Sequence, residues 1–255
     1  MNKGVLCISW DTELLWGRRD LNWQKFVSRV RKEREIIKNI LTILKKYEIP
    51  TTWAVVGKMW QKGDPDWYGP DIVKMIKNTA GQEIGSHSYS HELFDQIDTQ
   101  TAKIEAQNPF KLKSFVFPKN KVGYLKILKK NGFTTFRGPD KSEYELLLPR
   151  VPLVYKPFID NGLVNIPGSM YLVSGRGLRK FIPAGLRWLK VKMGIDGAIL
   201  EQKVFHIWAH PIDLVNDTEK IMANLERICE YASQKRGNKI LKIQTMGEIA
   251  SESDL

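Results

Sequence analysis

The sequence predicts an α/β fold in which a mainly parallel sheet is built through helical crossovers. Apolar, β-branched segments alternate with segments of helical periodicity along the 255 residues. Acids and histidines directly follow several of the predicted strands, where α/β sheets place their sites. An open doubly wound sheet and a closed barrel both fit this pattern. Because the polar residues come from strands far apart in sequence, we favour the barrel.

The first predicted strand covers residues 4–10 and ends at the polar cluster Asp11-Thr12-Glu13. A long basic helix follows, and Pro50 closes it before a strand at 51–56. The apolar positions of this helix recur at helical spacing: Ile36, Ile37, Ile40, Leu41, Ile43 and Leu44.

The same alternation continues to the end of the chain. We expect helices over residues 71–78, 123–130 and 218–234. We expect strands over residues 83–86, 114–117, 133–136, 204–209 and 239–245.

Composition indicates a single domain covering residues 1–255, since 42% hydrophobic content is enough for one large core. Cys7 and Cys229 are far apart and form no disulfide framework, so we expect reduced, buried thiols. The start of the chain lacks the apolar core of a secretory signal, and no apolar run of about 18 residues exists. We therefore expect a cytoplasmic location.

A net charge of +12 favours polyanionic neighbours, such as nucleic acid, anionic lipid or a phosphate-bearing substrate. Residues 176–193 concentrate this charge among apolar residues, and Pro183 interrupts any single long helix there. The segment resembles a basic amphipathic helix that lies on an anionic membrane. Alternatively, it is a helix that packs its apolar side on the core while its basic side chains stay solvated.

All four histidines fall in two copies of one spacing, His87-x-x-x-His91 and His206-x-x-x-His210. This spacing puts both rings of a pair on one face of a helix or of a strand. Converging imidazoles indicate metal binding, proton transfer or both. A hydrogen-bonded arrangement without metal is the alternative for any such pair. Both pairs lie at predicted strand ends, which favours a site.

Asp11-x-Glu13 after the first strand, His87-x-x-x-His91 and the late His210 together resemble the polysaccharide deacetylase family, a carbohydrate esterase family. The most specific match is Gly85-Ser86-His87-Ser88-Tyr89-Ser90-His91, which is similar to the family's second motif, H-S/T-x-x-H. The resemblance spans almost the whole chain. It implies a distorted (β/α) barrel, about seven parallel strands, and removal of acyl groups from sugars with a divalent metal, zinc above all.

On this resemblance, Glu13, His87 and His91 bind the metal, Asp11 is the general base and His210 is the general acid. The acids stand two apart, as in a D-x-E variant, and an exchange of roles between Asp11 and Glu13 stays open. A helix-capping role for either acid is the structural alternative. His206 is either a hydrogen-bonded core residue or an orienter behind the site.

The third motif departs from the family, because Phe117-Pro118-Lys119 has no arginine before its proline. Arg137 follows the next strand, and we expect it to orient Asp11 or to bind substrate, unless it is a surface residue of a turn. The family's fourth motif is not recognisable. Trp16 and Trp208, with Trp10, are candidates for stacking on a sugar, although tryptophans near strand ends also serve as ordinary core.

We therefore expect a metal-dependent hydrolase that removes an N-acetyl, O-acetyl or related acyl group from a sugar. The absence of an export signal favours a nucleotide-linked or lipid-linked precursor in surface polysaccharide or lipopolysaccharide biosynthesis. Peripheral membrane contact fits the basic surface, whereas nucleic acid is not the expected partner. Two alternatives stay open: a metal-independent cyclic amidase of the same fold, as in allantoinase-like proteins, and a non-catalytic basic module that binds membrane or nucleic acid.

Overall fold

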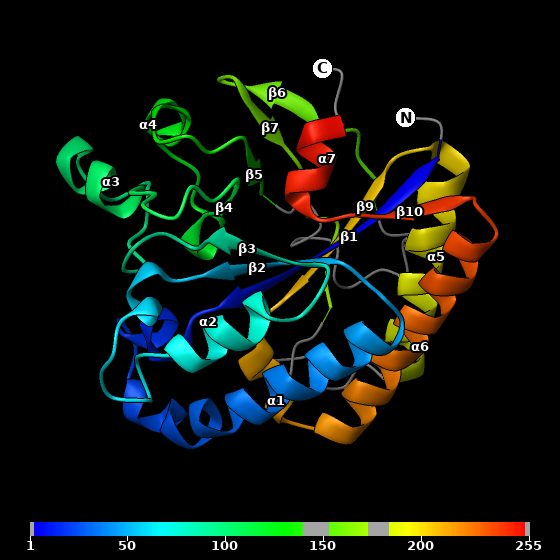
Figure 1. Cartoon of the computed structure of the whole chain (residues 1–255), viewed down its shortest axis with the longest axis horizontal. Helices are drawn as coiled ribbons and strands as arrows, with labels where there is room; N and C mark the ends of the chain where they lie inside the picture. Colours follow the sequence, from blue (N-terminus) through cyan, green and yellow to red (C-terminus); the bar gives the residue numbers. More distant parts are fainter. Residues whose placement is uncertain (1–2, 140–152, 173–183, 253–255) are drawn as a thin grey trace.

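One strongly curled sheet forms the centre of the computed structural model, which describes residues 3–139, 153–172 and 184–252 (Figure 1). The strands described are β1 Gly4–Thr12, β2 Thr51–Val55, β3 Gln82–Ser86, β4 Ser114–Val116, β5 Thr135–Arg137, β6 Phe158–Asp160, β7 Leu163–Asn165, β8 Met170–Tyr171, β9 Val204–Ala209 and β10 Leu241–Ile243. They follow the order β6-β7-β5-β4-β3-β2-β1-β9-β8, and β10 pairs with β1.

The sheet is parallel at every pairing except the antiparallel β6–β7 hairpin. Consecutive strands β1 to β5 lie side by side, and β9 returns from late in the chain to the other side of β1. The carboxyl ends of these strands therefore share one edge of a half-barrel. This arrangement confirms the predicted α/β class with a distorted β/α barrel.

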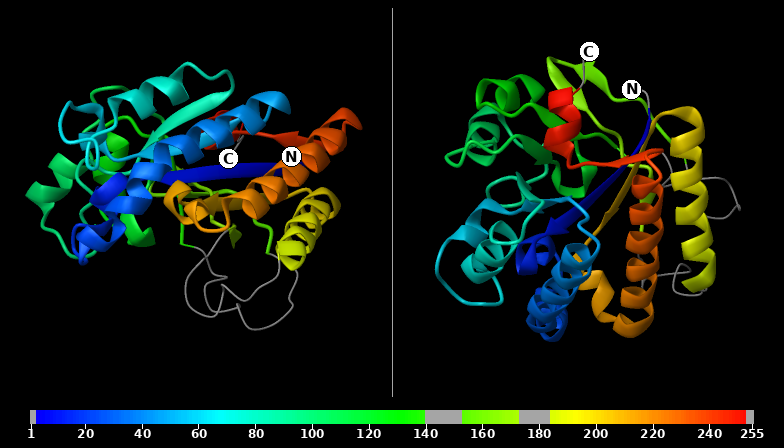
Figure 2. Two further views of the ribbon diagram at one scale, coloured as in Figure 1. Left: turned by 90° about the horizontal axis from the view of Figure 1, so that it is seen from below. Right: turned by 45° about the vertical axis from the view of Figure 1, so that its right-hand side comes forward.

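The helices described are α1 Val27–Lys46, α2 Pro70–Lys77, α3 Thr99–Glu105, α4 Leu125–Lys130, α5 Ala184–Glu201, α6 Thr218–Gly237 and α7 Met246–Glu252. Helices α1, α2, α5 and α6 share one core cluster with Ile8 and Trp10 of β1, whereas α7 packs against Val5 and Cys7 on the opposite face of that strand. Helices α1, α6 and α5 lie side by side in one outer layer (Figure 2). Short 3₁₀ helices occupy Leu14–Arg18, Trp23–Phe26, Gly57–Trp60, Pro118–Asn120 and Pro211–Val215.

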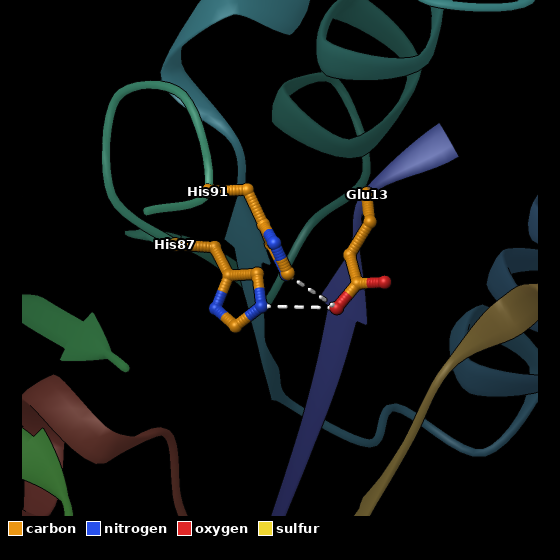
Figure 3. A group of neighbouring side chains, drawn as sticks. All are labelled: Glu13, His87 and His91. Atoms are coloured by element: carbon orange, nitrogen blue, oxygen red, sulfur yellow. Dashed lines mark hydrogen bonds and ion pairs between the residues drawn. The ribbon is translucent and has the colours of Figure 1, made fainter. Parts of the chain in front are cut away.

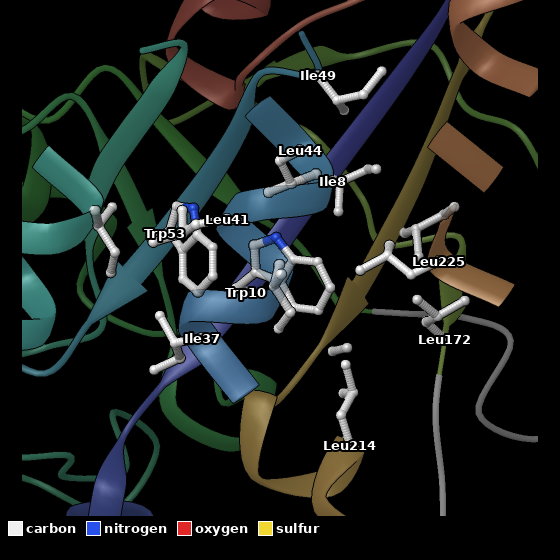
Figure 4. Close-up of a cluster of buried hydrophobic side chains, with 14 of the residues drawn as sticks. Ile8, Trp10, Ile37, Leu41, Leu44, Ile49, Trp53, Leu172, Leu214 and Leu225 are labelled. Atoms are coloured by element: carbon white, nitrogen blue, oxygen red, sulfur yellow. The ribbon is translucent and has the colours of Figure 1, made fainter. Parts of the chain in front are cut away.

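The largest core cluster lies between the sheet and the α1–α6 layer (Figure 4). Strand β1 is buried along all nine residues because β2, β9 and β10 flank it. Ile37 and Leu41 of α1 pack toward it, and the stacked rings of Trp10 and Trp53 have centroids 5.5 Å apart. Trp10 is therefore a core residue and offers no surface to a sugar.

Helices α2 and α3 begin at residues that favour the first turn of a helix. Pro70 occupies the first turn of α2, where its missing N–H is not needed. Asp98 caps α3, since its carboxylate accepts a hydrogen bond from the Thr101 amide at 2.7 Å.

The sheet has more strands than the expected seven, because the sequence analysis missed the two- and three-residue strands β6, β7 and β8. Helices α3 and α7 were missed as well, since seven residues give too short a periodic signal. The expected basic segment is described only from residue 184, where α5 begins. Residues 176–183 of that segment lie outside the described residues.

Among the described residues, no helix combines the length and the apolar character needed to cross a membrane. The sequence also contains no apolar run of that length.

Substitution of Ile40 by Ala should lower the free energy of unfolding by about 2–5 kcal/mol. The Ile40 side chain is fully buried in the cluster between α1 and the sheet, so truncation leaves a cavity. Chemical denaturation measures the change. Lys38→Ala, on the exposed side of the same helix, is the control and should change stability by less than about 0.5 kcal/mol. Equal effects of the two substitutions would contradict this packing.

Candidate metal and catalytic centre

The structure brings together five of the predicted site residues at the carboxyl edge of the sheet. Asp11 is the second-last residue of β1, and Glu13 directly follows the end of that strand. His87 and His91 lie in the loop after β3, and His210 follows β9. All except His210 are at least 96% buried, and the His210 side chain is 19% exposed. The parallel sheet therefore assembles acids and imidazoles that are distant in sequence.

Glu13 is the centre of this group, and Figure 3 shows its carboxylate facing the rings of His87 and His91. Its Oε1 lies 3.1 Å from His87 Nε2 and 3.2 Å from His91 Nε2. Zinc ligands lie 2.0–2.2 Å from the ion, so two ligands of a tetrahedral site stand about 3.3 Å apart. The two distances from Glu13 Oε1 match this spacing, and the ligand atoms of Glu13, His87 and His91 all lie within 4.8 Å of one another, so these residues could hold one metal ion.

The hydrogen bonds of His87 determine which of its two ring nitrogens carries the proton when the ring is neutral. His87 Nδ1 donates to the Val116 carbonyl at 2.8 Å, since a carbonyl can only accept. In a neutral ring, Nε2 then presents a lone pair to the Glu13 carboxylate, and two acceptors at 3.1 Å repel. Either a metal ion or a shared proton must therefore lie between the two atoms. A ligand histidine whose other nitrogen donates to a carbonyl is the usual arrangement at metal sites.

The loop that carries His91 is held in an unusual backbone conformation. Ser88 and His91 have φ of 61° and 67°, in the left-handed region that non-glycine residues rarely adopt. The Ser88 hydroxyl accepts from the His91 amide at 2.9 Å, and the buried Glu105 carboxylate accepts from the Ser90 amide at 2.8 Å. Burial also lowers the pKa of His91, which favours the neutral ring that a metal ligand needs.

Asp11 forms an ion pair with Arg137. Orienting Asp11 was one of the two roles expected for that arginine. Arg137 Nη1 and Nη2 donate to the two Asp11 carboxylate oxygens at 2.8 and 2.7 Å, in a bidentate pair that is almost fully buried. Burial opposes the charge of Asp11, but Arg137 outweighs it and the pKa of Asp11 is lowered. The carboxylate therefore stays ionised, and the alternative of a surface arginine in a turn is wrong.

His206 supports this pair from behind. Its Nδ1 donates to the Ile166 carbonyl at 3.3 Å, so its Nε2 accepts from the Ser9 hydroxyl at 2.9 Å. Ser9 Oγ in turn accepts from Arg137 Nη1 at 3.1 Å. Burial lowers the pKa of His206 to about 3, so the ring is neutral at physiological pH. His206 is a hydrogen-bonded core residue at the far end of a chain that leads through Ser9 and Arg137 to Asp11.

His210 lies between two sets of carboxylates. Its Nε2 is 3.3 Å from Glu13 Oε1 and 3.8 Å from Asp11 Oδ2. Its Nδ1 is 3.2 Å from the Tyr171 hydroxyl and 3.6 Å from Asp213 Oδ2, and the Tyr171 hydroxyl donates to Asp213. Burial opposes protonation, but these carboxylates outweigh it and raise the pKa of His210. The ring is therefore suited to carry a proton beside Glu13 and Asp11.

Trp16 and Trp208 lie near the site but are mostly buried, with exposures of 9% and 7%. The Trp208 ring lies under the Arg137 guanidinium, 4.4 Å from the ring centroid to Cζ. Trp16 Nε1 donates to the Trp67 carbonyl at 2.8 Å. The Trp208 ring also packs against His210, whereas the Trp16 ring packs against Trp67 and Tyr68. A contact of either ring or of Arg137 with substrate stays a prediction.

The sequence analysis missed three residues of the site: Arg18, Tyr171 and Asp213. Arg18 Nη1 donates to Glu13 Oε2 at 2.9 Å, which leaves Oε1 to face the histidines. Asp213 follows His210 by three residues in the 3₁₀ helix Pro211–Val215, and that spacing was a usable signal. Tyr171 comes from the two-residue strand β8, for which the sequence offered no signal.

A cavity of about 220 Å³ opens beside His91 and is edged by charged pairs. Arg19 Nη2 lies 2.5 Å from Glu92 Oε1, and Lys119 is paired with Asp20. The cavity is lined by Arg19, Asp20, His91, Glu92, Leu93, Gln96, Ile97 and Lys119. Donors and acceptors thus alternate around a space next to the candidate metal ligands.

A buried carboxyl lies behind the site on α1. Glu33 is 1% exposed, and neither of its carboxyl oxygens has a hydrogen-bond partner among the described residues. Burial raises the pKa of Glu33 to about 8, with the charges of Arg18 and Glu13 acting in opposite directions. At neutral pH the folded protein therefore holds Glu33 mostly protonated.

Residues 27–111 match the family model for polysaccharide deacetylase. The resemblance inferred from the sequence is confirmed for this segment, which contains His87 and His91, whereas Asp11, Glu13 and His210 lie outside it. A comparison with curated proteins gives no match.

Solved structures match along nearly the whole chain, at identities that establish the fold alone. A protein from Mycobacterium smegmatis assigned as a polysaccharide deacetylase has a TM-score of 0.69 at 15% identity and covers 98% of this chain and 90% of its own. Puue allantoinase has a TM-score of 0.69 at 16% identity, with 97% and 89% covered. A Pseudomonas aeruginosa PAO1 protein assigned as a polysaccharide deacetylase has 0.70 at 14% identity, with 97% and 89% covered.

The Glu33 carboxyl should lower the free energy of unfolding as the pH rises from 4.5 toward 8. Its pKa is higher in the folded state than the unfolded value of 4.5, so folding retains a proton between pH 4.5 and about 8. Relative to the wild type, Glu33→Gln should therefore gain about 3 kcal/mol of unfolding free energy between pH 4.5 and 7. Urea denaturation across this range measures the gain.

Glu35→Gln, at an exposed position of the same helix, is the matched control and should follow the wild-type pH dependence. Parallel stability curves for Glu33→Gln and the wild type would contradict a protonated Glu33.

Proposed function

We propose that the protein is a metal-dependent hydrolase that removes an acetyl or related acyl group from a sugar. The observation that carries the proposal is the convergence of Glu13 Oε1 with the Nε2 atoms of His87 and His91 at distances that suit one divalent ion. The polysaccharide deacetylase match over residues 27–111 supports the same chemistry.

The donor set fits zinc. Two imidazoles and one carboxylate are typical of catalytic zinc sites, which keep a further position open for a water or substrate oxygen. Glu13 is the favoured carboxylate ligand, because Arg137 takes both oxygens of Asp11 whereas Arg18 takes only one oxygen of Glu13. A divalent ion held there would polarise the acyl carbonyl and lower the pKa of a bound water.

Asp11 is positioned as the general base. Its carboxylate is ionised, lies next to Glu13 and is fixed in orientation by the bidentate pair with Arg137. It can accept the proton of the attacking water without moving. The hydrogen-bond chain from His206 through Ser9 keeps Arg137 in place.

His210 is positioned as the general acid. The Tyr171 hydroxyl and Asp213 hold its Nδ1 side, so its Nε2 points toward Glu13 and Asp11. The raised pKa of His210 favours a protonated ring, which can give its proton to the departing amine or alkoxide. Base and acid thus face the same point beside Glu13, with His210 Nε2 3.8 Å from Asp11 Oδ2.

A sugar substrate suits the cavity beside His91, because its charged pairs offer alternating donors and acceptors to hydroxyl groups. The basic surface favours a sugar on a phosphate-bearing carrier, either a nucleotide or a lipid, as in a cytoplasmic step of surface polysaccharide or lipopolysaccharide biosynthesis. A cyclic amidase is the second candidate, since Puue allantoinase matches the fold as well as the proteins assigned as deacetylases do.

The purified protein should bind about one divalent ion per chain and lose that ion when His87 is replaced by Ala. Acetate release from N-acetylated and O-acetylated sugars, free and nucleotide-linked, should require the ion. Chelation should abolish turnover and zinc should restore it. Full turnover of a cyclic amide by metal-free protein would instead support the amidase.

Asp11→Asn should retain the ion but lose about 10²–10⁴-fold in kcat, because it removes the base and leaves the ligands in place. Metal analysis and acetate release, measured on the same preparation, separate the two roles. Glu35→Gln is the control that should change neither quantity. If Asp11→Asn loses the ion while Glu13→Gln keeps it, the two acids have exchanged roles.

A further inference from the structure

Helix α5 presents an apolar face to solvent in its first turns. Leu186 and Leu189 are 52% and 48% exposed, and Lys190 and Met193 are half-buried. Spacings of three, four and seven residues from Leu186 place these four side chains on one side of the helix. The solvent-exposed face of a helix is ordinarily polar. A pair of exposed leucines beside a lysine therefore indicates a surface that binds another molecule.

The opposite side of α5 is already committed to the core. Val191, Ile195 and Ala198 are fully buried in the main cluster, and Gly194 lies against the Phe205 ring so closely that a Cβ there would come within 2.3 Å of it. The helix cannot rotate to bury Leu186 and Leu189 without losing these contacts. The two leucines therefore stay outward.

The sequence that leads into and through these turns is rich in basic residues, although Asp217 lies within electrostatic range of Arg187 and Asp196 pairs with Lys192. Residues 161–195 contain six basic residues and no Asp or Glu: Arg176, Arg179, Lys180, Arg187, Lys190 and Lys192. Of these, Arg187, Lys190 and Lys192 belong to α5, and Asp196 and Glu201 lie only in its later turns. Exposed leucines with flanking lysine and arginine are the features of helices that lie in the interface of anionic membranes.

The apolar face lies at the end of the molecule that carries the site. Helix α5 leads into β9 after a short connection, and Ala198 packs against Gly4 at the start of β1 (Figure 1). The first turns of α5 are therefore near the carboxyl ends of the strands. Arg187 lies within electrostatic range of Tyr171, whose hydroxyl contacts His210.

We infer that the first turns of α5, through Leu186, Leu189 and Lys190, dock the protein on a membrane surface that contains anionic lipid. A second copy of the chain is the less suitable occupant, because it would bring two basic faces together. Lipid headgroups supply the opposite charge, and the acyl region accepts the leucines. Docking itself does not depend on the proposed function. Only its purpose rests on that function, because a docked enzyme would reach a lipid-linked sugar.

Cosedimentation with vesicles of phosphatidylcholine and phosphatidylglycerol tests this docking. The wild type should bind these vesicles, bind pure phosphatidylcholine vesicles far less, and release as salt rises. Leu186→Ser/Leu189→Ser should lower the partition coefficient roughly tenfold or more. Leu200→Ser is the matched control, since Leu200 is 85% exposed at the other end of the same helix, and it should bind like the wild type.

Metal content and circular dichroism should be the same in all three proteins, so a failure of docking is distinguishable from a failure of the proposed function. The inference is overturned by absence of binding at low salt, or by equal binding of the wild type and the double variant. It is also overturned if Leu200→Ser weakens binding as much as the double variant does. A dimer that the double variant converts to a monomer, without vesicle binding, would identify a second copy as the occupant.

Discussion

The contact between His87 and Glu13 constrains the rest of the site. His87 Nδ1 is committed to the Val116 carbonyl, so its Nε2 meets the Glu13 carboxylate as one acceptor against another. That geometry is stable only with positive charge between the two atoms. Arg18 compensates one Glu13 oxygen, and His91 and His210 turn toward the other. The arrangement around Glu13 is thus the arrangement of groups around a cation.

The topology of the sheet explains how such a group forms in one place. Strand β1 is central, with β2 and β9 as its direct neighbours and β3 beyond β2. Because all of these strands are parallel, the residues that follow them share one edge. Arg137 closes the group from β5, where its guanidinium lies over the Trp208 ring. Its bidentate pair with Asp11 makes the charge of Asp11 tolerable in the interior. Asp11 of β1 is thus matched by Arg137 of β5, whereas Glu13 is matched by Arg18 of the adjoining 3₁₀ helix and by the histidines that follow β3 and β9.

Much of this could be predicted from residue types and spacing. The polar cluster after an apolar strand and the two histidine pairs located Asp11, Glu13, His87, His91 and His210, because chemistry at strand ends leaves a local signal. Tyr171 and Glu33 left none, since a two-residue strand and one acid in a basic helix look ordinary in sequence. Arg137 was expected either to orient Asp11 or to bind substrate, and the curl of the sheet, which no local pattern encodes, is what brings it against Asp11.

X-ray diffraction at the zinc absorption edge, from crystals grown with zinc, tests the central claim most directly. An anomalous peak should lie about 2.0–2.2 Å from Glu13 Oε1, His87 Nε2 and His91 Nε2. If the three side chains keep their present positions and no peak lies between them, a proton shared by His87 Nε2 and Glu13 Oε1 takes the place of the metal ion. That result would contradict a metal centre.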